Sequence, residues 1–321
     1  MAKFHFTLLM RSPEHQSMLA YLETVESLIW GLEQLGHSTS FELNAIRPDE
    51  INVIANLGML SLAEVRCLPM GSIFLNLEQR VLPVGLDYRA ATTRAMDGIE
   101  QERWDRLLYT VDHHHFWDYS LANLVGIEAM HPQREHFYLP ICWSPTLEKI
   151  GHINRKDIEV IFCGSMNENR EQFFRDCLYG TVGSAGKRPF FGVTVANSYG
   201  DVRDELLARS QIALHAPRSQ IDPEIFGIVR CAYLMANRIP VICQEHRKPD
   251  EHFVEADIKG AVTFCANHQA NEVIGALLED PCRLSEYTER LYTTIRSRDL
   301  IGHLRDIVGK NNFYVKQPLD Q

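Results

Sequence analysis

The chain has 321 residues, of which 45% are hydrophobic and 23% are charged; this composition is typical of soluble globular proteins, and the length predicts two domains. The formal net charge of −10 argues against a general binder of nucleic acids or anionic membranes, although it leaves room for a local basic cleft. No apolar run approaches the ~20 residues that cross a bilayer, and the first residues lack the features of a signal peptide. We therefore expect a cytoplasmic protein without a membrane span.

Eight cysteines are scattered along the chain, and none forms a C-x-x-C pair. Several of them, including Cys163 and Cys243, lie in apolar runs that are typical of buried strands. Buried, reduced thiols in a cytoplasmic protein fit this pattern better than disulfides or a zinc site.

Strand-like and helical patterns alternate in the first half of the chain. A strand is predicted over 4–10, followed by a helix over 16–35 that ends at Gly36. Residues 117–129 predict a turn followed by a helix. Further strands are predicted over 38–46, 50–59, 71–81 and 136–145. Alternating strands and helices indicate parallel pairing and a doubly wound sheet.

A second alternating series follows residues 146–156, a polar stretch without clear periodicity that we interpret as a linker. Its strands are predicted over 157–165, 188–195, 211–217, 239–245 and 261–266. Its helices are predicted over 167–180, 199–210, 224–237 and 271–307. The fold class expected is therefore α/β, with two Rossmann-like domains facing each other across a cleft. Residues 1–145 form the first domain, and residues 157–321, with the C-terminal helices, form the second.

The stretch "VIFCGSMNENR" carries the first candidate for ligand binding. A buried strand runs into Gly164 and Ser165, and a helix with Asn167 and Arg170 at its start follows. Glycine lets a backbone approach a ligand closely, and a helix N-terminus offers N–H groups to an anion. The same residues also suit a plain strand–turn–helix corner in which Ser165 or Asn167 caps the helix. No dinucleotide or P-loop motif is present.

The stretch "QIALHAPRSQIDPEIFGIVR" carries the second candidate. His215 and Arg218 follow a predicted parallel strand, at the edge where doubly wound sheets bind ligands. Glu224 opens the next helix, and Arg230 lies in its apolar first turns, where a buried guanidinium needs a partner. A diphosphate is one candidate partner, because arginine binds phosphate in a bidentate manner. Alternatively, Arg230 snorkels towards solvent or pairs with a nearby carboxylate such as Glu245.

Candidate bases are found in the first half. Three adjacent histidines at 113–115 cannot all face one metal on a strand, and no H-x-x-x-H partner is near, so no metal site is expected. Asp112, His113 or His115 could act as a general base near the cleft, although solvated loop histidines explain at least two of the three. Glu14, in the loop after the first strand, is a further candidate, and that loop equally suits a plain helix entry.

Taken together, these segments resemble nucleotide-sugar glycosyltransferases of the GT-B fold, in particular bacterial and phage members. The resemblance is best in the C-terminal half, from "DIEVIFCGSMNENR" through "SQIALHAP" to "FGIVRCAYLMANRIPVICQE". It is thinner for "WDYSLANLVGI" and "FYLPICWSP". Many retaining members carry two glutamates in an E-x7-E pattern. Glu224 matches the first, but Ala232 stands where the second is expected.

The resemblance implies that the C-terminal domain holds the nucleotide diphosphate and the N-terminal domain holds the acceptor. Gly164, Ser165 and Arg170 would then lie near the diphosphate, Arg230 would neutralise it, and Glu245 would lie near the ribose or the sugar. The expected activity is hexosyl or pentosyl transfer from a nucleotide-diphosphate sugar, with arginines stabilising the leaving group.

Neither a cofactor nor a metal is expected, in agreement with the lack of a D-x-D motif flanked by apolar strand residues. The acceptor stays unidentified: nucleic acid is disfavoured by the acidic charge, although a modified base stays open. The alternatives are a nucleotide-sugar epimerase or hydrolase, and a non-catalytic nucleotide-sugar-binding protein on the same fold.

Overall fold

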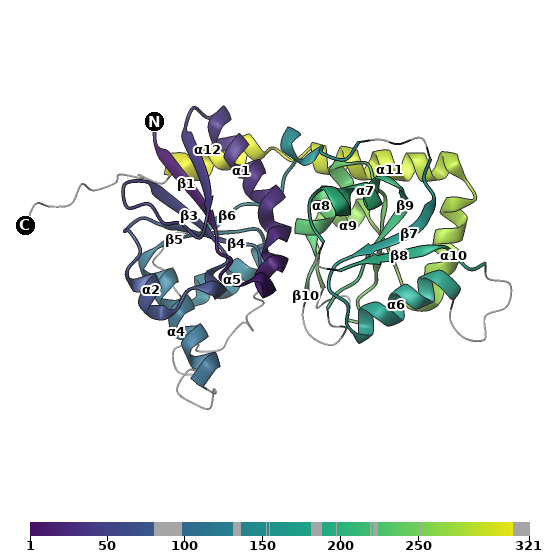
Figure 1. Cartoon of the computed structure of the whole chain (residues 1–321), viewed down its shortest axis with the longest axis horizontal. Coiled ribbons are helices and arrows are strands. Elements are labelled where there is room, and N and C mark those ends of the chain that lie inside the picture. Colours follow the sequence, from purple (N-terminus) through teal and green to yellow (C-terminus); the bar gives the residue numbers. More distant parts are fainter. Residues whose placement is uncertain are drawn as a thin grey trace, which may run out of the picture. The chain divides into compact units, whose positions relative to one another are not determined.

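The computed structural model shows two compact units, each with its own sheet (Figure 1). The first comprises Met1–Ile141 and Asp299–Gln321, and the second comprises Cys142–Arg298. The residues that the structure describes are 1–79, 98–130, 136–151, 153, 155–180, 188–196, 198–218, 220, 224–248, 250 and 252–310.

The first unit is built on a six-stranded parallel sheet. Its strand order is β2-β1-β3-β4-β5-β6. The strands are β1 (Lys3–Leu8), β2 (Ser38–Leu43), β3 (Ile51–Ala55), β4 (Ile73–Asn76), β5 (His115–Asp118) and β6 (Phe137–Tyr138). The helices are η1 (Pro13–Tyr21), α1 (Leu22–Gln34), η2 (Leu57–Met59), α2 (Leu62–Arg66), α4 (Gly98–His113), α5 (Leu121–Met130) and α12 (Leu300–Lys310). Side chains from α2, α4 and α5 form one hydrophobic core with residues of β3, β4 and β5, including Phe74 and Phe116.

The second unit contains a five-stranded parallel sheet in the order β13-β11-β9-β7-β8. These strands are β7 (Ile158–Cys163), β8 (Gly192–Val195), β9 (Ser210–His215), β11 (Val241–Gln244) and β13 (Thr263–Cys265). The helices are α6 (Glu168–Tyr179), α7 (Asp201–Ala208), α8 (Ile228–Ala236), α9 (Ala256–Ala261), α10 (Asn267–Leu278) and α11 (Pro281–Arg296), and the 3₁₀ turn η3 spans Pro145–Leu147. A small separate sheet pairs β10 (Glu224–Ile225) with β12 (His252–Phe253). The expected α/β class, with one Rossmann-like sheet in each half, is confirmed.

Two predicted helices differ from the structure for local reasons. The helix expected from 224 begins only at Ile228, because Glu224 and Ile225 form β10 and Gly227 takes the N-cap position. The helical stretch expected over 271–307 is divided into three helices, α10, α11 and α12. Pro281 occupies the first turn of α11, where its missing N–H costs nothing, so it starts a new helix instead of continuing the previous one.

The division between the units also differs from the expected one. Residues in the expected linker are bound to the second unit: the Asn237 side chain donates to the Leu147 carbonyl at 2.7 Å and accepts from the Ile150 N–H at 2.7 Å. The helix α12, expected in the second domain, packs on α1 of the first (Figure 1). Gly31 allows this close packing, since a Cβ there would lie 2.5 Å from Leu304 Cδ1.

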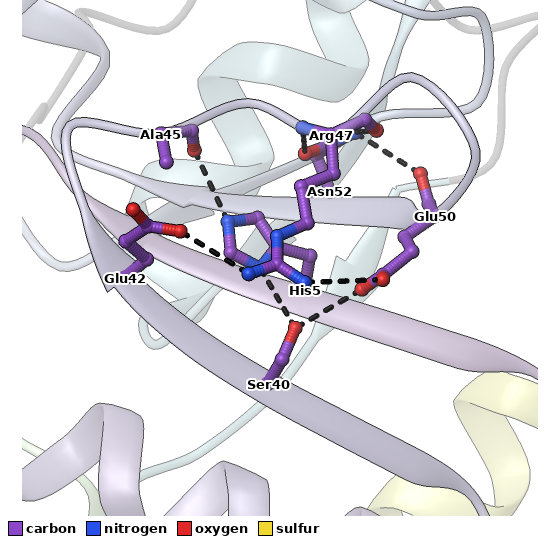
Figure 2. A network of polar contacts seen from close by, with 7 residues as sticks. All are labelled: His5, Ser40, Glu42, Ala45, Arg47, Glu50 and Asn52. Atoms are coloured by element: carbon purple, nitrogen blue, oxygen red, sulfur yellow. Dashed lines mark hydrogen bonds and ion pairs between the residues drawn. The ribbon is translucent and has the colours of Figure 1, made fainter.

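A polar network crosses one face of β2, β1 and β3 in the first unit (Figure 2). Ser40, His5 and Asn52 are direct cross-strand neighbours. His5 is fully buried and bonds Ser40 Oγ at 2.8 Å and the Ala45 carbonyl at 3.2 Å, while Asn52 binds both the N–H and the carbonyl of Arg47. Burial lowers the pKa of His5. The network therefore fixes the segment between β2 and β3 through hydrogen bonds.

The strand orders locate the ligand-binding edge of each sheet. In both units the chain adds its second strand on one side of the first strand and its third strand on the other side. The winding direction thus reverses between β1 and β3 in the first unit and between β7 and β9 in the second. Open α/β sheets bind ligands beyond the carboxyl ends of the strands at this reversal, called the topological switch point.

Candidate functional site

The switch point of the second unit brings two of the predicted segments together. Gly164 and Ser165 follow directly after β7, and His215 is the last residue of β9. The two strands pair in register from Ile158 with Ser210 to Phe162 with Leu214, so their carboxyl ends lie side by side. The chain then returns through α8, whose start contributes Arg230 to the same edge.

Arg230 lies against Gly164. A Cβ on Gly164 would lie 2.9 Å from Arg230 Nη2 and 3.1 Å from Cζ, so any other residue there would displace the guanidinium. Its φ of +147° also disfavours any other residue. Arg230 Nη1 is buried without a hydrogen-bond partner, and no ion pair joins Arg230 to Glu245 among the described side chains. Among the described side chains, Glu245 is therefore not its partner, and Nη1 keeps an unused donor.

His215 and Gly227 form a second tight contact beside the first. A Cβ on Gly227 would lie 2.9 Å from His215 Nε2 and closer still to Cε1. The histidine is 4% exposed, packs edge-on against Phe226 at 5.1 Å, and its Nδ1 has no hydrogen-bond partner. Gly227 is the N-cap of α8 and supplies no side-chain cap, and the N–H groups of Ile228 and Arg230 donate to the carbonyls of Phe226 and Gly227.

Arg170 and Asn167 bind the protein itself. Arg170 is buried, and its Nε donates to the Ala216 carbonyl at 3.0 Å, while Nη1 donates to the carbonyl and Oγ of Ser165, each at 3.0 Å. Asn167 caps α6 by accepting the Arg170 N–H, as the sequence suggested, and also donates to the Arg218 carbonyl at 2.7 Å. These contacts join the segment after β7 to the segment after β9.

The remaining donor-side candidates are spread along the same edge. Arg218 is exposed and follows β9, and Glu245 is exposed and follows β11. Glu224 lies in β10, and its side chain falls outside the described residues. Ala232, which replaces the second glutamate of E-x7-E, is only 1% exposed in α8, so a carboxylate at that position would be buried.

The sequence patterns did not indicate Arg203 or Asn169 as candidates. Asn169, at the start of α6, donates to the Pro217 carbonyl at 3.0 Å. Arg203 lies in the first turns of α7 and acts electrostatically on Cys163 at the end of β7, as Arg230 does; burial nevertheless raises the pKa of the Cys163 thiol to about 11. Arg203 is ion-paired with Asp204, which in turn accepts a hydrogen bond from the Tyr233 hydroxyl at 2.7 Å. Its proximity to β7 follows from the sheet order, which no local pattern in the sequence indicates.

Three of the four candidate bases lie at the amino end of β5, away from the edge where open α/β sheets bind ligands. Asp112 and His113 end α4, and His115 begins β5, so all three lie at the amino edge of the first sheet. His113 stacks on Tyr109 at 3.9 Å. This placement contradicts the expectation that they line the ligand edge. Glu14 belongs to η1, which follows the carboxyl end of β1, and its side chain lies outside the described residues.

A buried carboxylate occupies the carboxyl end of β5. Asp118 is fully buried, and its oxygens accept hydrogen bonds from Asn76 Nδ2, the Ser120 N–H and Asn123 Nδ2, at 2.6, 2.8 and 2.9 Å. These bonds connect the ends of β4 and β5 to the start of α5. Asp118 therefore builds the carboxyl edge of the first sheet.

Within the described part of the chain, no three His, Cys, Asp or Glu side chains are grouped so that they could hold a metal ion. No helix among the described residues is long and apolar enough to cross a membrane.

Comparison with known proteins identifies the fold. No family model matches the chain, and no curated protein matches it. Among solved structures, HepE of Anabaena in complex with UDP and glucose has a TM-score of 0.55 at 9% identity, covering 96% of this chain and 99% of that one. The apo form of OtsA gives 0.54 at 10% identity, with 100% of both chains covered. WaaG, a glycosyltransferase involved in lipopolysaccharide biosynthesis, gives 0.53 at 12% identity, covering 96% and 100%. At these identities the likeness shows the fold.

Proposed function

Since the chain has the fold of GT-B glycosyltransferases, we propose that it transfers a sugar from a nucleotide-diphosphate sugar to an acceptor that is not yet identified. The donor binds at the switch point of the second unit, beyond the carboxyl ends of β7 and β9. The acceptor binds at the carboxyl edge of the first sheet.

The observation that supports the donor site most strongly is the unpartnered, buried Nη1 of Arg230. Leaving a buried charged donor unsatisfied costs free energy, so such a group is retained where a ligand completes it. A guanidinium binds two phosphate oxygens at once, which suits a diphosphate better than a neutral ligand. Gly164 lets the Arg230 guanidinium lie against the backbone after β7, and the N-terminus of α8 adds a favourable dipole.

The same arrangement suits the chemistry of glycosyl transfer. Negative charge develops on the departing diphosphate as the bond to the sugar breaks. A fixed cation in a partly buried site stabilises that charge without reorganising at the moment of reaction. Arg230 can therefore do by itself what a bound metal does in other transferases, and we propose a metal-independent reaction.

The roles of the other residues follow from their positions. Ser165 and His215 flank the diphosphate, Arg218 contributes positive charge at the rim, and Glu245 is placed to accept hydroxyls of the ribose or the sugar. Glu14 is the one candidate base of the four that belongs to a segment at the carboxyl edge of the first sheet. A retaining reaction needs no such base, and an inverting one would use it.

A ligand panel tests the proposal. Because the similar HepE structure contains UDP and glucose, UDP and UDP-glucose are measured first, followed by GDP, ADP and the matching nucleosides. Stabilisation in a thermal-shift assay by one nucleoside diphosphate, and not by its nucleoside, is expected. Equal responses to a nucleoside and its diphosphate, or no response to any of them, would refute the donor site.

Turnover separates the alternatives. A transferase releases nucleoside diphosphate slowly from its donor and faster when an acceptor is added. An epimerase converts the nucleotide sugar without releasing diphosphate, a hydrolase releases it at a rate that no acceptor changes, and a binding protein leaves the donor intact. Chromatography of the donor after incubation, with and without a set of glycoside and peptide acceptors, distinguishes these outcomes.

A further inference from the structure

Three side chains at the start of α6 bind three consecutive backbone carbonyls of the segment after β9. Asn167 Nδ2 donates to the Arg218 carbonyl at 2.7 Å, and Asn169 Nδ2 donates to the Pro217 carbonyl at 3.0 Å. Arg170 Nε donates to the Ala216 carbonyl at 3.0 Å. We call Asn167, Asn169 and Arg170 the α6 clamp.

The clamp spans the switch point of the second sheet. Its three residues follow β7, whereas the three carbonyls follow β9, and these two strands are neighbours between which the winding reverses. Segment 216–218 lies outside any helix or strand, and Ala216 and Pro217 are buried. Buried carbonyls of irregular backbone need partners, and here they receive them from the opposite side of the crevice. The clamp thereby fixes the segment after β7 and the segment after β9 relative to each other. The proposed ligand position between these two segments, at the switch point, is called the donor crevice below.

The two arginines of the crevice are used differently. Arg170 uses Nε on the Ala216 carbonyl and Nη1 on Ser165, whereas Nη1 of Arg230 has no partner. A guanidinium that binds two protein segments is held in place and holds them in place. A guanidinium with an unused, buried donor is available to a ligand.

We infer that the α6 clamp positions the donor crevice, and that Arg170 is a positioning residue instead of a diphosphate ligand. Asn169 extends the clamp to the next strand, because Nδ2 also donates to Gln244 Oε1 at 2.8 Å and Oδ1 accepts from Gln244 Nε2 at 3.1 Å. Gln244 is 2% exposed at the end of β11. The ends of β7, β9 and β11 are therefore joined by one set of side chains, and a crevice that is rigid before binding loses less entropy when a ligand arrives.

Hydrogen–deuterium exchange of the free protein tests the clamp without any ligand. Asn167→Asp keeps the oxygen that caps α6, since aspartate is an equally good N-cap, but it cannot donate to the Arg218 carbonyl. Asn169→Ala removes the hydrogen bond to the Pro217 carbonyl together with the two to Gln244. Asn167→Asp is expected to speed exchange of the amides of 213–216 and 218 by about five-fold, the effect of one lost hydrogen bond, and Asn169→Ala is expected to speed it by more, because Asn169 also bonds Gln244 twice. Arg175→Ala, which removes only the surface pair with Glu171 on the same helix, is the control. Unchanged exchange in Asn167→Asp and Asn169→Ala would overturn the inference.

A second measurement separates positioning from direct phosphate binding, and it depends on the proposed function. Calorimetry compares UDP with uridine for the wild type, Asn169→Ala and Arg170→Lys. A positioning role predicts that both ligands weaken by a similar factor in Asn169→Ala, and that Arg170→Lys, which keeps the charge but loses the planar fork, weakens both as well. Loss of UDP affinity alone in Asn169→Ala, or wild-type affinity in Arg170→Lys, would contradict it. If the wild type binds none of UDP, GDP and ADP while the exchange result holds, the proposed function fails and the clamp stands.

Discussion

The guanidinium of Arg230 occupies the space that a side chain at Gly164 would need: a Cβ there would lie 2.9 Å from Nη2 and 3.2 Å from Nη1. Gly164 follows β7 and Arg230 lies in α8, more than sixty positions later in the chain. The contact therefore depends on the folded second unit. It places the positive charge of Arg230 directly beside the backbone at Gly164.

Replacing Gly164 tests this contact. Gly164→Ala should destabilise the protein by about 1–3 kcal/mol, because φ is +147° and the new Cβ meets Arg230. It should also displace the guanidinium and weaken UDP binding about ten-fold or more, as loss of a charged hydrogen bond does. Gly200→Ala is the matched control, since Gly200 also has positive φ but nothing within 4 Å of its Cβ. Denaturant unfolding and calorimetry on both variants check the two effects. UDP affinity equal in both would refute the steric link.

Gly227 gives a test of the contact with His215. Its φ of −72° suits any residue, so the effect of Gly227→Ala is steric: the methyl group would push the His215 ring aside. We expect a loss of about 1–3 kcal/mol in the free energy of unfolding. By contrast, Gly260→Ala in α9, where no atom lies within 4 Å, should stabilise the protein by about 0.5–1 kcal/mol. Equal unfolding midpoints for Gly227→Ala and the wild type would show that His215 moves freely.

The lowered pKa of His252 predicts that the protein loses stability in mild acid. Burial lowers its pKa to about 4, and His215, His246 and Lys259 act in the same direction. An unfolded histidine titrates near pH 6.5. Between about pH 6.5 and 4, the unfolded chain therefore binds a proton that folded His252 does not, and stability falls as the pH falls, by at most about 1.4 kcal/mol per pH unit.

Denaturant unfolding at several pH values checks this. His252→Asn carries no titrating ring, so its stability should fall less steeply than that of the wild type between pH 6.5 and 4. Part of the slope should remain in the variant, because burial also lowers the pKa of His5 and of His37 in the first unit. Parallel curves for the two proteins would show that His252 titrates normally in the folded state.

Leu304 tests the assignment of α12 to the first unit. It is fully buried and packs at Gly31 of α1. Leu304→Ala should cost about 2–4 kcal/mol through the cavity it leaves. Hydrogen exchange should then accelerate in peptides of α1 and β1, but not in those of α11. Arg305→Ala, at an exposed position of the same helix, controls for changes in helix propensity. Faster exchange confined to α10 and α11 would place α12 with the second unit after all.

Much of the fold could be predicted from local pattern. The apolar runs before Gly164 and after Arg238 are β7 and β11, because parallel strands buried on both faces read as continuous hydrophobic stretches. The pattern over 271–307 was helical throughout, yet Pro281 divides it. Periodicity reports which residues can be helical and is insensitive to where one helix ends and the next begins.

The candidate site could be predicted only in part. The sequence indicates that Gly164, His215 and Arg230 lie at one sheet edge, because each follows a strand or lies near the start of a helix, and the structure places them there. Asp112 and His115 were misplaced because the boundary between α4 and β5 decides which end of the strand they occupy. Arg203 depends on the order of strands in the sheet, a non-local property that no motif in this chain encodes.

The central claim is that Arg230 binds the diphosphate of a nucleotide ligand. Calorimetry of UDP and uridine with the wild type, Arg230→Ala and Arg230→Lys tests it most directly, and denaturant unfolding of each variant controls for folding. We expect Arg230→Ala to weaken UDP binding by about 10–100-fold and to leave uridine binding unchanged, since a charged hydrogen bond contributes about 1.5–3 kcal/mol. Arg230→Lys should fall between the two. Wild-type UDP affinity in a correctly folded Arg230→Ala protein would contradict the account.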